Sequence, residues 1–308
     1  MAGGVITTGS FVKALWPGLK GIWGRKYNQH PVEYLDLFEK ETSDKAYEEF
    51  MSVTGFGIGQ IKPQGQQIPY DSEQQGWIAR LTNVTYALGY ICTFEEIQDN
   101  KYEAITKTRT AMLAYSAIQC KEQTGALLYN RATNPAFPGA DGVALASTVH
   151  PNISGGFFAN TPTVAADLSE ASLEDALINI MGFTGDKGLF ISVMPRSLIV
   201  PRQEWFNANR ILKSVYQSGT ANNDINVLRA TSALPEGIKL NHYLTAPHTW
   251  FVRTTVGGGG RGMIYQERMP IEFMQDNDFD TKNFKAAYVE RYTFGWDDPR
   301  CIWVVPGP

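Results

Sequence analysis

Residues 77–94 read WIARLTNVTYALGYICTF, and residues 95–131 read EEIQDNKYEAITKTRTAMLAYSAIQCKEQTGALLYNR. The first segment alternates polar and apolar side chains, which is typical of one long β-strand. The second segment has helical spacing throughout, and a helix of that length would be roughly 50 Å long. Both elements exceed the width of a typical domain. We therefore expect residues 77–94 to reach away from their own subunit, like the arms of proteins that assemble into larger structures.

The composition describes an ordinary folded protein. The chain has 308 residues, of which 43% are hydrophobic and 19% are charged, enough for a substantial core. No apolar run is long enough to cross a membrane, and the first residues lack the layout of a signal peptide. Three cysteines without motif spacing predict a reducing environment and no disulfide framework.

The charge argues against a dedicated nucleic-acid binder. The net charge is −4, whereas such proteins need clustered positive charge to displace counterions from phosphates. Residues 1–32 are an exception, because they carry Lys13, Lys20, Arg25 and Lys26 and no acidic residue. This segment predicts contact with nucleic acid or an acidic surface, with a solvated tail as an equal alternative.

The first 32 residues also contain two tryptophans, Trp16 and Trp23. Both look exposed in this pattern, which suggests that the segment docks onto a neighbouring subunit. Pro17 and the glycines around it are expected to break any long helix here.

A helix is expected around Tyr47, Phe50 and Met51, whose spacing is helical and which Asp44 would cap. Residues 55–76 are rich in Gly, Gln and Pro and predict a polar loop with little to bury.

The rest of the chain mixes helices and strands. Helices are expected over 168–183, with Met181 on the buried face, and over 203–215, with Phe206 pointing inward. A buried strand is expected over 189–194, ended by Pro195. Because helices and strands do not alternate strictly, the fold class is α+β and not a doubly wound sheet. Further strands are expected over 250–256, 263–266, 271–274, 284–294 and 302–305.

Three patterns resemble chemical motifs, and each has a stronger structural explanation. Gly257–Gly262 matches the dinucleotide-binding fingerprint, but a strand pattern closed by Pro270 follows it instead of a helix. Asp276–Asp280 resembles half of a calcium loop, yet Thr281 and Ala287 stand where Gly and Glu are needed. The four histidines lack metal-ligand spacing. We therefore expect no catalytic residue, no cofactor, no metal site and no enzyme activity.

Three segments resemble the major capsid proteins of tailed bacteriophages. Residues 86–96, YALGYICTFEE, and the following Asp99-Asn-Lys-Tyr102 are similar to the beginning of the spine helix in those proteins. Residues 140–152, ADGVALASTVHPN, resemble a recurring segment, with Ala146 where a bulky apolar residue is usual. Residues 288–302, YVERYTFGWDDPRCI, fit the last peripheral strands. In order and spacing these segments cover nearly the whole chain.

The resemblance implies the coat fold shared by tailed phages and herpesviruses. This is an α+β fold with an N-terminal arm, an extended β-hairpin loop, a long spine helix, and peripheral and axial domains. The implied boundaries are the N-terminal arm at 1–54, the extended loop at 55–94, the spine helix and first part of the peripheral domain at 95–144, the axial domain at 145–260, the second part of the peripheral domain at 261–296, and a C-terminal strand returning to the axial domain at 297–308.

The implied function is that of a major capsid protein of a tailed double-stranded DNA phage. It would self-assemble into pentamers and hexamers of an icosahedral shell in the host bacterial cytoplasm and reside in the virion. Its partners would be other copies, a separate scaffolding protein, a portal and, as a further candidate, a decoration protein. Packaged DNA would meet the inner surface only non-specifically, and no membrane is involved.

An extended strand laid across a neighbour would find backbone partners there, as in β-augmentation. Gln217–Asp224 would face the centre of each capsomer. The candidate contacts between subunits are Trp16, Trp23, Gln66, Tyr70, Trp77, Arg80, Gln217, Asn222 and Asn223.

Two other interpretations stay open. Another self-assembling virion component, such as a minor head, vertex or tube protein, would form rings or fibres instead of closed shells. A cytosolic enzyme with an unrecognised site would need convergent polar groups in a pocket and would remain a monomer or small oligomer.

Overall fold

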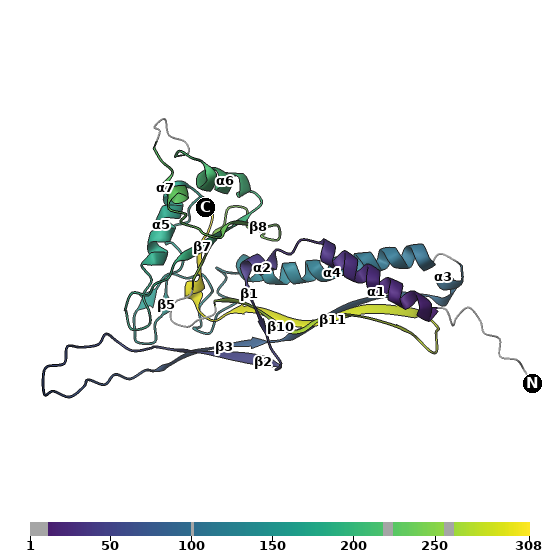
Figure 1. The fold of residues 1–308 in the computed structure, drawn as a ribbon, viewed down its shortest axis with the longest axis horizontal. Helices are drawn as coiled ribbons and strands as arrows, with labels where there is room; N and C mark the ends of the chain where they lie inside the picture. Colours follow the sequence, from purple (N-terminus) through teal and green to yellow (C-terminus); the bar gives the residue numbers. More distant parts are fainter. Residues whose placement is uncertain (1–11, 100–101, 218–223, 256–261) are drawn as a thin grey trace, which may run out of the picture. The chain divides into compact units, whose positions relative to one another are not determined.

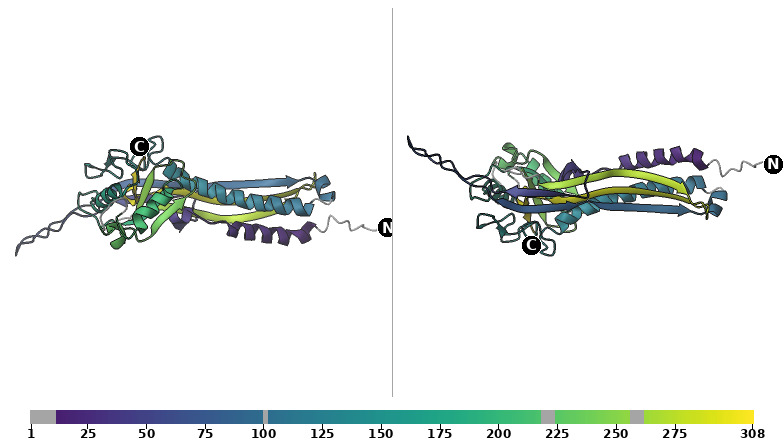
Figure 2. Two further views of the ribbon diagram at one scale, coloured as in Figure 1. Left: turned by 90° about the horizontal axis from the view of Figure 1, so that it is seen from above. Right: turned by 90° about the horizontal axis from the view of Figure 1, so that it is seen from below.

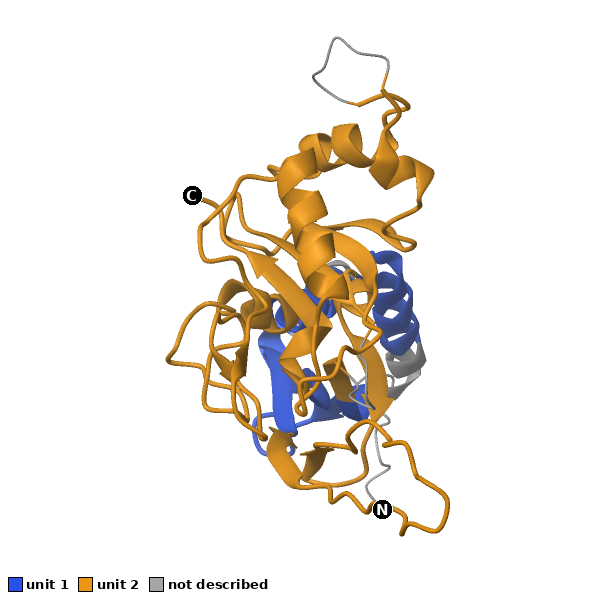
Figure 3. Ribbon diagram, turned by 90° about the vertical axis from the view of Figure 1, so that its left-hand side faces the viewer, with its two compact units in different colours: residues 1–32, 83–123, 267–293 blue, residues 33–82, 124–266, 294–308 orange. Residues whose placement is uncertain are grey.

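The computed structural model describes residues 12–99, 102–217, 224–255 and 262–308 (Figure 1). The chain forms two compact units, and each is built from segments far apart in sequence (Figure 3). Unit 1 comprises residues 1–32, 83–123 and 267–293. Unit 2 comprises residues 33–82, 124–266 and 294–308. Helices and strands are mixed in the sequence order, so the predicted α+β class is confirmed.

A four-stranded sheet has the order β1-β10-β11-β4. Its strands are β1 (Glu39–Thr42), β10 (Met263–Asn277), β11 (Phe284–Trp296) and β4 (Val84–Cys92). β4 and β11 are antiparallel, with Phe284 opposite Cys92 and Tyr292 opposite Val84. In unit 1, helices α1 (Val12–Gln29) and α4 (Tyr102–Asn130) lie on one face of these strands (Figure 2). The short helix α3 (Phe94–Gln98) precedes α4.

The core of unit 1 is aromatic around Trp23. Its indole stacks on Phe273 at 5.0 Å and on Tyr288 at 5.7 Å between ring centroids. Packing of this kind explains why α1 runs for 18 residues through Pro17 and three glycines, contrary to the expectation that they break a long helix. Tertiary contacts of an apolar face outweigh intrinsic helix propensity.

A buried ion pair lies in unit 1 between α4 and β11. Lys121 Nζ is 2.6 Å from Glu290 Oε2, and the side chains are only 5% and 1% exposed. Lys121 also donates to the Tyr27 hydroxyl at 3.4 Å and lies 5.2 Å from the centroid of the Tyr292 ring. Burial raises the pKa of Glu290, and the Lys121 ammonium opposes this shift.

Unit 2 contains a second four-stranded sheet, in the order β12-β9-β7-β8. β7 (Pro195–Pro201) is parallel to β8 (Gly237–Asn241) and antiparallel to β9 (Trp250–Thr254). β12 (Ile302–Val305) pairs with β9. Helices α5 (Glu170–Met181), α6 (Trp205–Lys213) and α7 (Val227–Ala230) contribute buried leucines and isoleucines to the same core. Shorter elements of unit 2 are α2 (Tyr34–Leu37), β5 (His150–Pro151), β6 (Phe157–Phe158) and η2 (Pro299–Cys301).

Local sequence signals located α5 well. Ser169 caps the helix by accepting from Ser172 N, and the Ser172 hydroxyl accepts from Ser169 N, which completes a capping box. The expectation for Met181 was wrong, because this side chain is 48% exposed. Phe206 of α6 is likewise 73% exposed and not inward-facing.

Three other expectations about elements were also wrong. Residues 47–53 form a strand, β2, and not a helix capped by Asp44, because they pair with a second strand along their length. The buried strand begins at Pro195, directly after the predicted range 189–194. The expected strands 263–266 and 271–274 are parts of one strand, β10.

Residues 77–131, which were expected to form one strand and one helix, form two strands and two helices. Residues 75–82 and 84–92 form separate strands, β3 and β4, which belong to different sheets and meet at the buried Asn83. The expected single strand was therefore wrong, because each half has its own pairing partner. The helical part begins with α3, capped by Thr93 through Glu96 N, and continues as α4, whose 29 residues span about 44 Å.

Candidate assembly surface

β2 (Tyr47–Val53) and β3 (Gln75–Thr82) form a two-stranded antiparallel sheet in unit 2. The pairing runs from Tyr47 opposite Thr82 to Met51 opposite Ile78, and its register shifts before Val53. Both are edge strands, so each has one side that can pair with a further chain. A hairpin with only two strands is marginally stable in water by itself.

Cross-strand contacts near the body of unit 2 orient the hairpin. Arg80 Nη2 and Nε lie 2.6 and 2.8 Å from Glu49 Oε1, and the guanidinium lies 4.5 Å from the centroid of the Tyr47 ring. The Arg80 side chain is 58% exposed, so solvent screens this ion pair and it adds little to stability.

The loop between the strands, residues 54–74, leaves large apolar side chains in solvent. Ile61 is 96% exposed, Tyr70 91% and Ile58 75%. Every residue from 56 to 74 is exposed. The views of Figures 1 and 2 show the loop extending from the rest of unit 2. Contiguous exposed apolar groups of this kind mark sites of protein–protein contact.

The loop is nevertheless ordered by contacts between its two limbs. Thr54 N donates to Gln74 O at 3.1 Å, and Gly57 N donates to Asp71 Oδ2 at 2.7 Å. Gln66 N donates to Pro63 O at 3.2 Å and closes the tip. These bonds hold residues 54–74 as a two-limbed extension with a turn at its end.

One lysine of unit 2 fixes the loop at its base. Lys187 Nζ lies 2.6 Å from Asp71 Oδ2 and donates to Ser72 O at 2.8 Å. The pKa of Asp71 falls from 3.8 to about 2, chiefly through the hydrogen bond from Lys187 and also through the Gly57 and Ser72 amides. We call the Asp71–Lys187 contact the latch.

A cavity of about 400 Å³ lies where the hairpin joins the rest of unit 2. Its walls combine aromatic and carboxylate side chains. The lining includes residues 50–55 of the hairpin, Trp77, Asp141, Pro151, Phe158, residues 185–186, Ile191 and residues 296–300.

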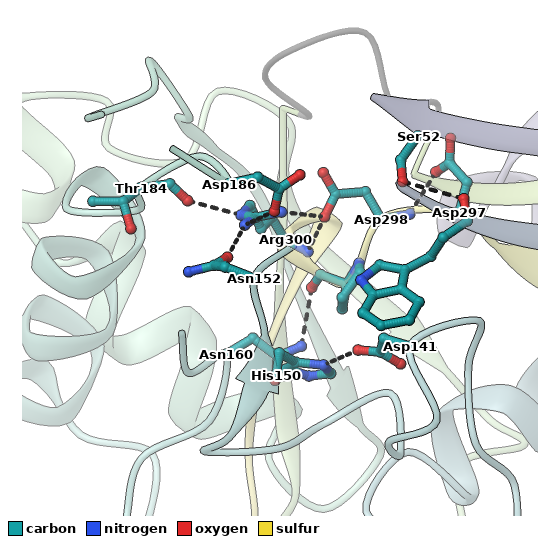
Figure 4. A network of polar contacts seen from close by, with 12 residues as sticks. Ser52, Asp141, His150, Asn152, Asn160, Thr184, Asp186, Asp297, Asp298 and Arg300 are labelled. Carbon is teal, nitrogen blue, oxygen red and sulfur yellow. Dashed lines mark hydrogen bonds and ion pairs between the residues drawn. The ribbon is translucent and has the colours of Figure 1, made fainter. Parts of the chain in front are cut away.

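Arg300 organises the polar side of the cavity (Figure 4). Its Nε donates to Thr184 O at 2.9 Å, and its Nη2 lies 2.8 Å from Asn152 Oδ1 and 3.2 Å from Asp186 Oδ1. The guanidinium stacks over the Phe158 ring at 3.9 Å. Burial raises the pKa of Asp298 against the lowering effect of Arg300, and the negative charges of Asp297 and Asp186 raise it further.

His150 and Asn160 connect this region to the segment that contains Asp141 (Figure 4). His150 Nδ1 is 2.6 Å from Asp141 Oδ2, and its Nε2 is 3.1 Å from Asn160 Oδ1. Asn160 Nδ2 donates to Leu145 O and Pro299 O, which fixes the orientation of the amide. His150 is 1% exposed, so these bonds serve to satisfy buried polar groups.

The candidate chemical motifs take structural roles where they are described. Met263, directly after the glycine run, begins strand β10, so no helix N-terminus is available for a dinucleotide; residues 256–261 themselves lie outside the described ranges. Asp278 organises the β10–β11 turn by accepting from Asp280 N and Thr281 N. Within the described ranges, no cluster of His, Cys, Asp and Glu could hold a metal ion. Among helices of those ranges, none has the length and apolar character to span a bilayer.

A family model described as phage capsid protein matches residues 80–305, which is most of the chain. The chain belongs to this phage capsid protein family. The identification of a phage capsid protein from the sequence and the fold class are confirmed. As a member of this family, it is a structural protein of the virion.

Solved structures show the same fold for this capsid protein. The capsid of cyanophage P-SCSP1u matches with a TM-score of 0.54 at 12% identity, covering 90% of this chain and 88% of that one. The mature capsid of bacteriophage PhiM1 gives 0.52 at 10% identity, with coverage of 90% and 87%. A virus-like particle from Pyrococcus furiosus gives 0.51 at 8% identity, with coverage of 93% and 97%. No curated protein matches the sequence.

The structure separates the contact residues predicted for this capsid protein. Four belong to the hairpin and are exposed: Gln66, Tyr70, Trp77 and Arg80. Trp77 also lines the cavity.

The other predicted contacts lie elsewhere. Trp23 is 5% exposed, so the expectation that it is exposed was wrong; it packs within unit 1. Trp16 lies in α1, but its side chain is outside the described residues. Gln217 N donates to Asp224 O at 2.9 Å, whereas Asn222 and Asn223 lie outside the described residues.

Three residues important to this surface escaped the sequence reasoning. Asp71, Lys187 and Arg300 hold the hairpin and its cavity in place. Asp71 and Lys187 are 116 positions apart. No local pattern signals such a pairing.

Proposed function

We propose that this capsid protein assembles by laying its β2–β3 hairpin across a neighbouring subunit. The proposal rests on the exposure of Ile58, Ile61 and Tyr70. These side chains belong to an extended loop whose two limbs are joined by hydrogen bonds. Transfer of each such side chain from water into an interface contributes about 1.5–3 kcal/mol. In a closed ring each subunit takes part in two such contacts, one through its own hairpin and one through the hairpin that it receives.

Edge strands supply the second component of the contact. β2 and β3 each have an outer edge, where a strand of the neighbour can extend the sheet by β-augmentation. Gln66, Tyr70, Trp77 and Arg80 are the hairpin residues that we assign to the interface. Many such contacts, each modest, combine into a stable shell through multivalency.

The arrangement of subunits follows from a contact of this type. A hairpin that reaches from one subunit to a different surface of the next is heterologous, and such contacts close into rings when the rotation fits. We propose that these rings are the pentamers and hexamers of an icosahedral shell. Residues 217–224, including Gln217, Asn222 and Asn223, would face the ring centre. Trp16 in the N-terminal arm would contact a neighbour.

The remaining assignments concern domains and partners. We propose an N-terminal arm at 1–54, an extended loop at 55–94, a peripheral domain from 95–144 and 261–296, and an axial domain at 145–260 joined by 297–308. Separate scaffolding and portal proteins, and a decoration protein as a further candidate, would act with it in the host cytoplasm. The net charge of −4 supports only non-specific contact with packaged DNA.

Shortening the hairpin tests the proposal. Residues 55–73 are replaced by Asn-Gly, which joins the bonded pair Thr54 and Gln74 by a two-residue turn. Because these residues pack on little besides the latch, the variant is expected to fold with nearly the same melting temperature. It should form no particles by negative-stain microscopy and light scattering, under conditions where the unchanged chain does. Particles of normal size and stability from the shortened chain would contradict the proposal.

A further inference from the structure

We propose that the cavity at the hairpin base receives the tip of the hairpin of the next copy, with Lys62 as the side chain that it recognises. This inference rests on the proposed function, because it names the surface that the hairpin meets. The partner is a second copy of this chain, bound tip to base.

The cavity has a chemistry that favours a cation on an apolar stem. Among its described lining residues, four are aspartates, at positions 141, 186, 297 and 298, and Arg300 is the one arginine. Trp77, Phe158 and Trp296 supply aromatic walls. Its volume of about 400 Å³ lies within the range of about 300–1,000 Å³ typical of ligand pockets. Lysine fits such a site, because its methylene stem packs on apolar surface while the ammonium reaches the carboxylates.

Two of the carboxylates share one cation. Arg300 lies 3.2 Å from Asp186 and 3.4 Å from Asp298, so one guanidinium serves two carboxylates. Burial is the main cause of the raised pKa of Asp298, and the negative charges of Asp297 and Asp186 raise it further. An additional ammonium would relieve this repulsion, and the cavity is open to receive it.

The hairpin tip has the complementary chemistry. Lys62 is the only cation in residues 54–74, next to the almost fully exposed Ile61 and near the turn closed by Gln66 and Pro63. Within the described residues, Lys62 forms no ion pair, and its side chain is exposed. The tip therefore presents an apolar group and a positive charge side by side, matching the two kinds of wall in the cavity.

The same hydrogen bonds that order the loop prevent it from filling its own cavity. Contacts at Thr54–Gln74 and Gly57–Asp71 hold the limbs together, and Lys187 holds Asp71 near the base. Lys62 lies beyond these contacts, on the extended part of the loop. A tip held outward in this way meets the cavity of another subunit, which gives a head-to-tail contact that can close into a ring.

Cross-linking between two variants, each with one introduced cysteine, tests the contact directly. One variant carries Lys62→Cys at the hairpin tip, and the other carries Ser52→Cys in the cavity wall. The two chains are mixed, assembled and treated with a short bismaleimide. The native Cys92 and Cys301 are buried, and Cys120 is half-buried. We expect a covalent heterodimer of the two variants in particles and not in unassembled subunits. Lys45 is an exposed lysine before β2. In the control, Lys45→Cys replaces Lys62→Cys, and we expect no covalent heterodimer.

Charge reversal provides an independent measurement. Lys62→Glu should reduce particle yield by at least about tenfold, because like charges juxtaposed in an interface are strongly unfavourable. Lys62→Arg and the control Lys45→Glu should stay within about twofold of the unchanged chain. The melting temperature of the subunit should be the same for all three variants, since both lysines are exposed.

The outcomes separate the two proposals. Particles without the Lys62–Ser52 heterodimer, or normal yield from Lys62→Glu, would overturn the docking in the cavity while leaving hairpin-driven assembly intact. Normal particles from the shortened hairpin would instead overturn the proposed function and, with it, this inference. A heterodimer that forms equally with Lys45→Cys would also overturn the docking, because it would show non-specific contact.

Discussion

Unit 1 and the loop of residues 54–74 distribute their side chains in opposite ways. Unit 1 buries a charged pair, Lys121 and Glu290, beneath an aromatic core. The loop exposes Ile61 and Tyr70 to solvent on a frame of a few hydrogen bonds. In unit 1, the buried charged groups, whose desolvation is unfavourable, therefore have partners within the same chain. In the proposed assembly, the loop would find such partners on a second chain, so the two regions would separate folding of the subunit from its assembly.

The largest effect on folding is expected from Lys121→Ala. Removing the ammonium leaves the Glu290 carboxylate buried without its ion partner, which typically costs about 3–5 kcal/mol. Urea unfolding followed by tryptophan fluorescence should report the loss, since Trp23 stacks in the core of unit 1.

Two further variants control this measurement. Lys107→Ala, at an exposed position of α4, should change the free energy of unfolding by no more than about 0.5 kcal/mol. The double variant Lys121→Met with Glu290→Leu should recover most of the loss, because no buried charge remains. A loss below about 1 kcal/mol for Lys121→Ala would show that unit 1 does not depend on the pair.

A smaller effect is expected from the same substitution at two glycines. A Cβ at Gly89 in β4 would lie 2.8 Å from Ala286 O and 2.9 Å from Ala287 Cβ, so Gly89→Ala should cost about 1–3 kcal/mol through overpacking. A Cβ at Gly59 in the loop would meet nothing within 4 Å, so Gly59→Ala should be nearly neutral. Thermal unfolding of both variants compares the packed region with the open one, and equal losses would remove the contrast.

The smallest effect concerns the latch. The pKa of Asp71 is lowered from 3.8 to about 2, so the contribution of the latch is present above about pH 4 and is lost as the pH falls through about 2. Lys187→Met should return this pKa toward about 3.9, the usual value for Asp. Titration of the Asp71 carboxyl carbon by NMR measures both midpoints. Added salt should raise the midpoint of the unchanged chain, because the pair is exposed and screened.

Local signals predicted much of the fold but not its pairing. Helix α5 and most of the C-terminal strands followed from short-range patterns. Tyr47, Phe50 and Met51 were misread as helical, because their spacing fits a helix while their strand conformation depends on pairing with β3. Trp23 was misread as exposed, because its stacking partner Phe273 lies 250 positions away in the sequence.

The candidate assembly surface was likewise predicted in part from the sequence and in part only seen in the structure. Gln66, Tyr70, Trp77 and Arg80 were predicted as contact residues; all four are exposed, and their contact with a neighbouring subunit stays a prediction. The cavity was not predicted, because it brings together residues 50–55, 185–186 and 296–300, which no spacing rule connects.

The sequence by itself determined that this protein has an α+β capsid fold with a long helix and an exposed loop, and that its motifs for chemistry are incomplete. Periodicity and capping are encoded by neighbours along the chain, so these features could be read directly. Only the tertiary structure decided that residues 77–92 divide at Asn83 between two sheets, and that Lys187 and Arg300 fix the hairpin and its cavity. Strand partners and ion pairs are chosen by contacts between distant segments, whose free energy depends on the packed arrangement and not on local sequence.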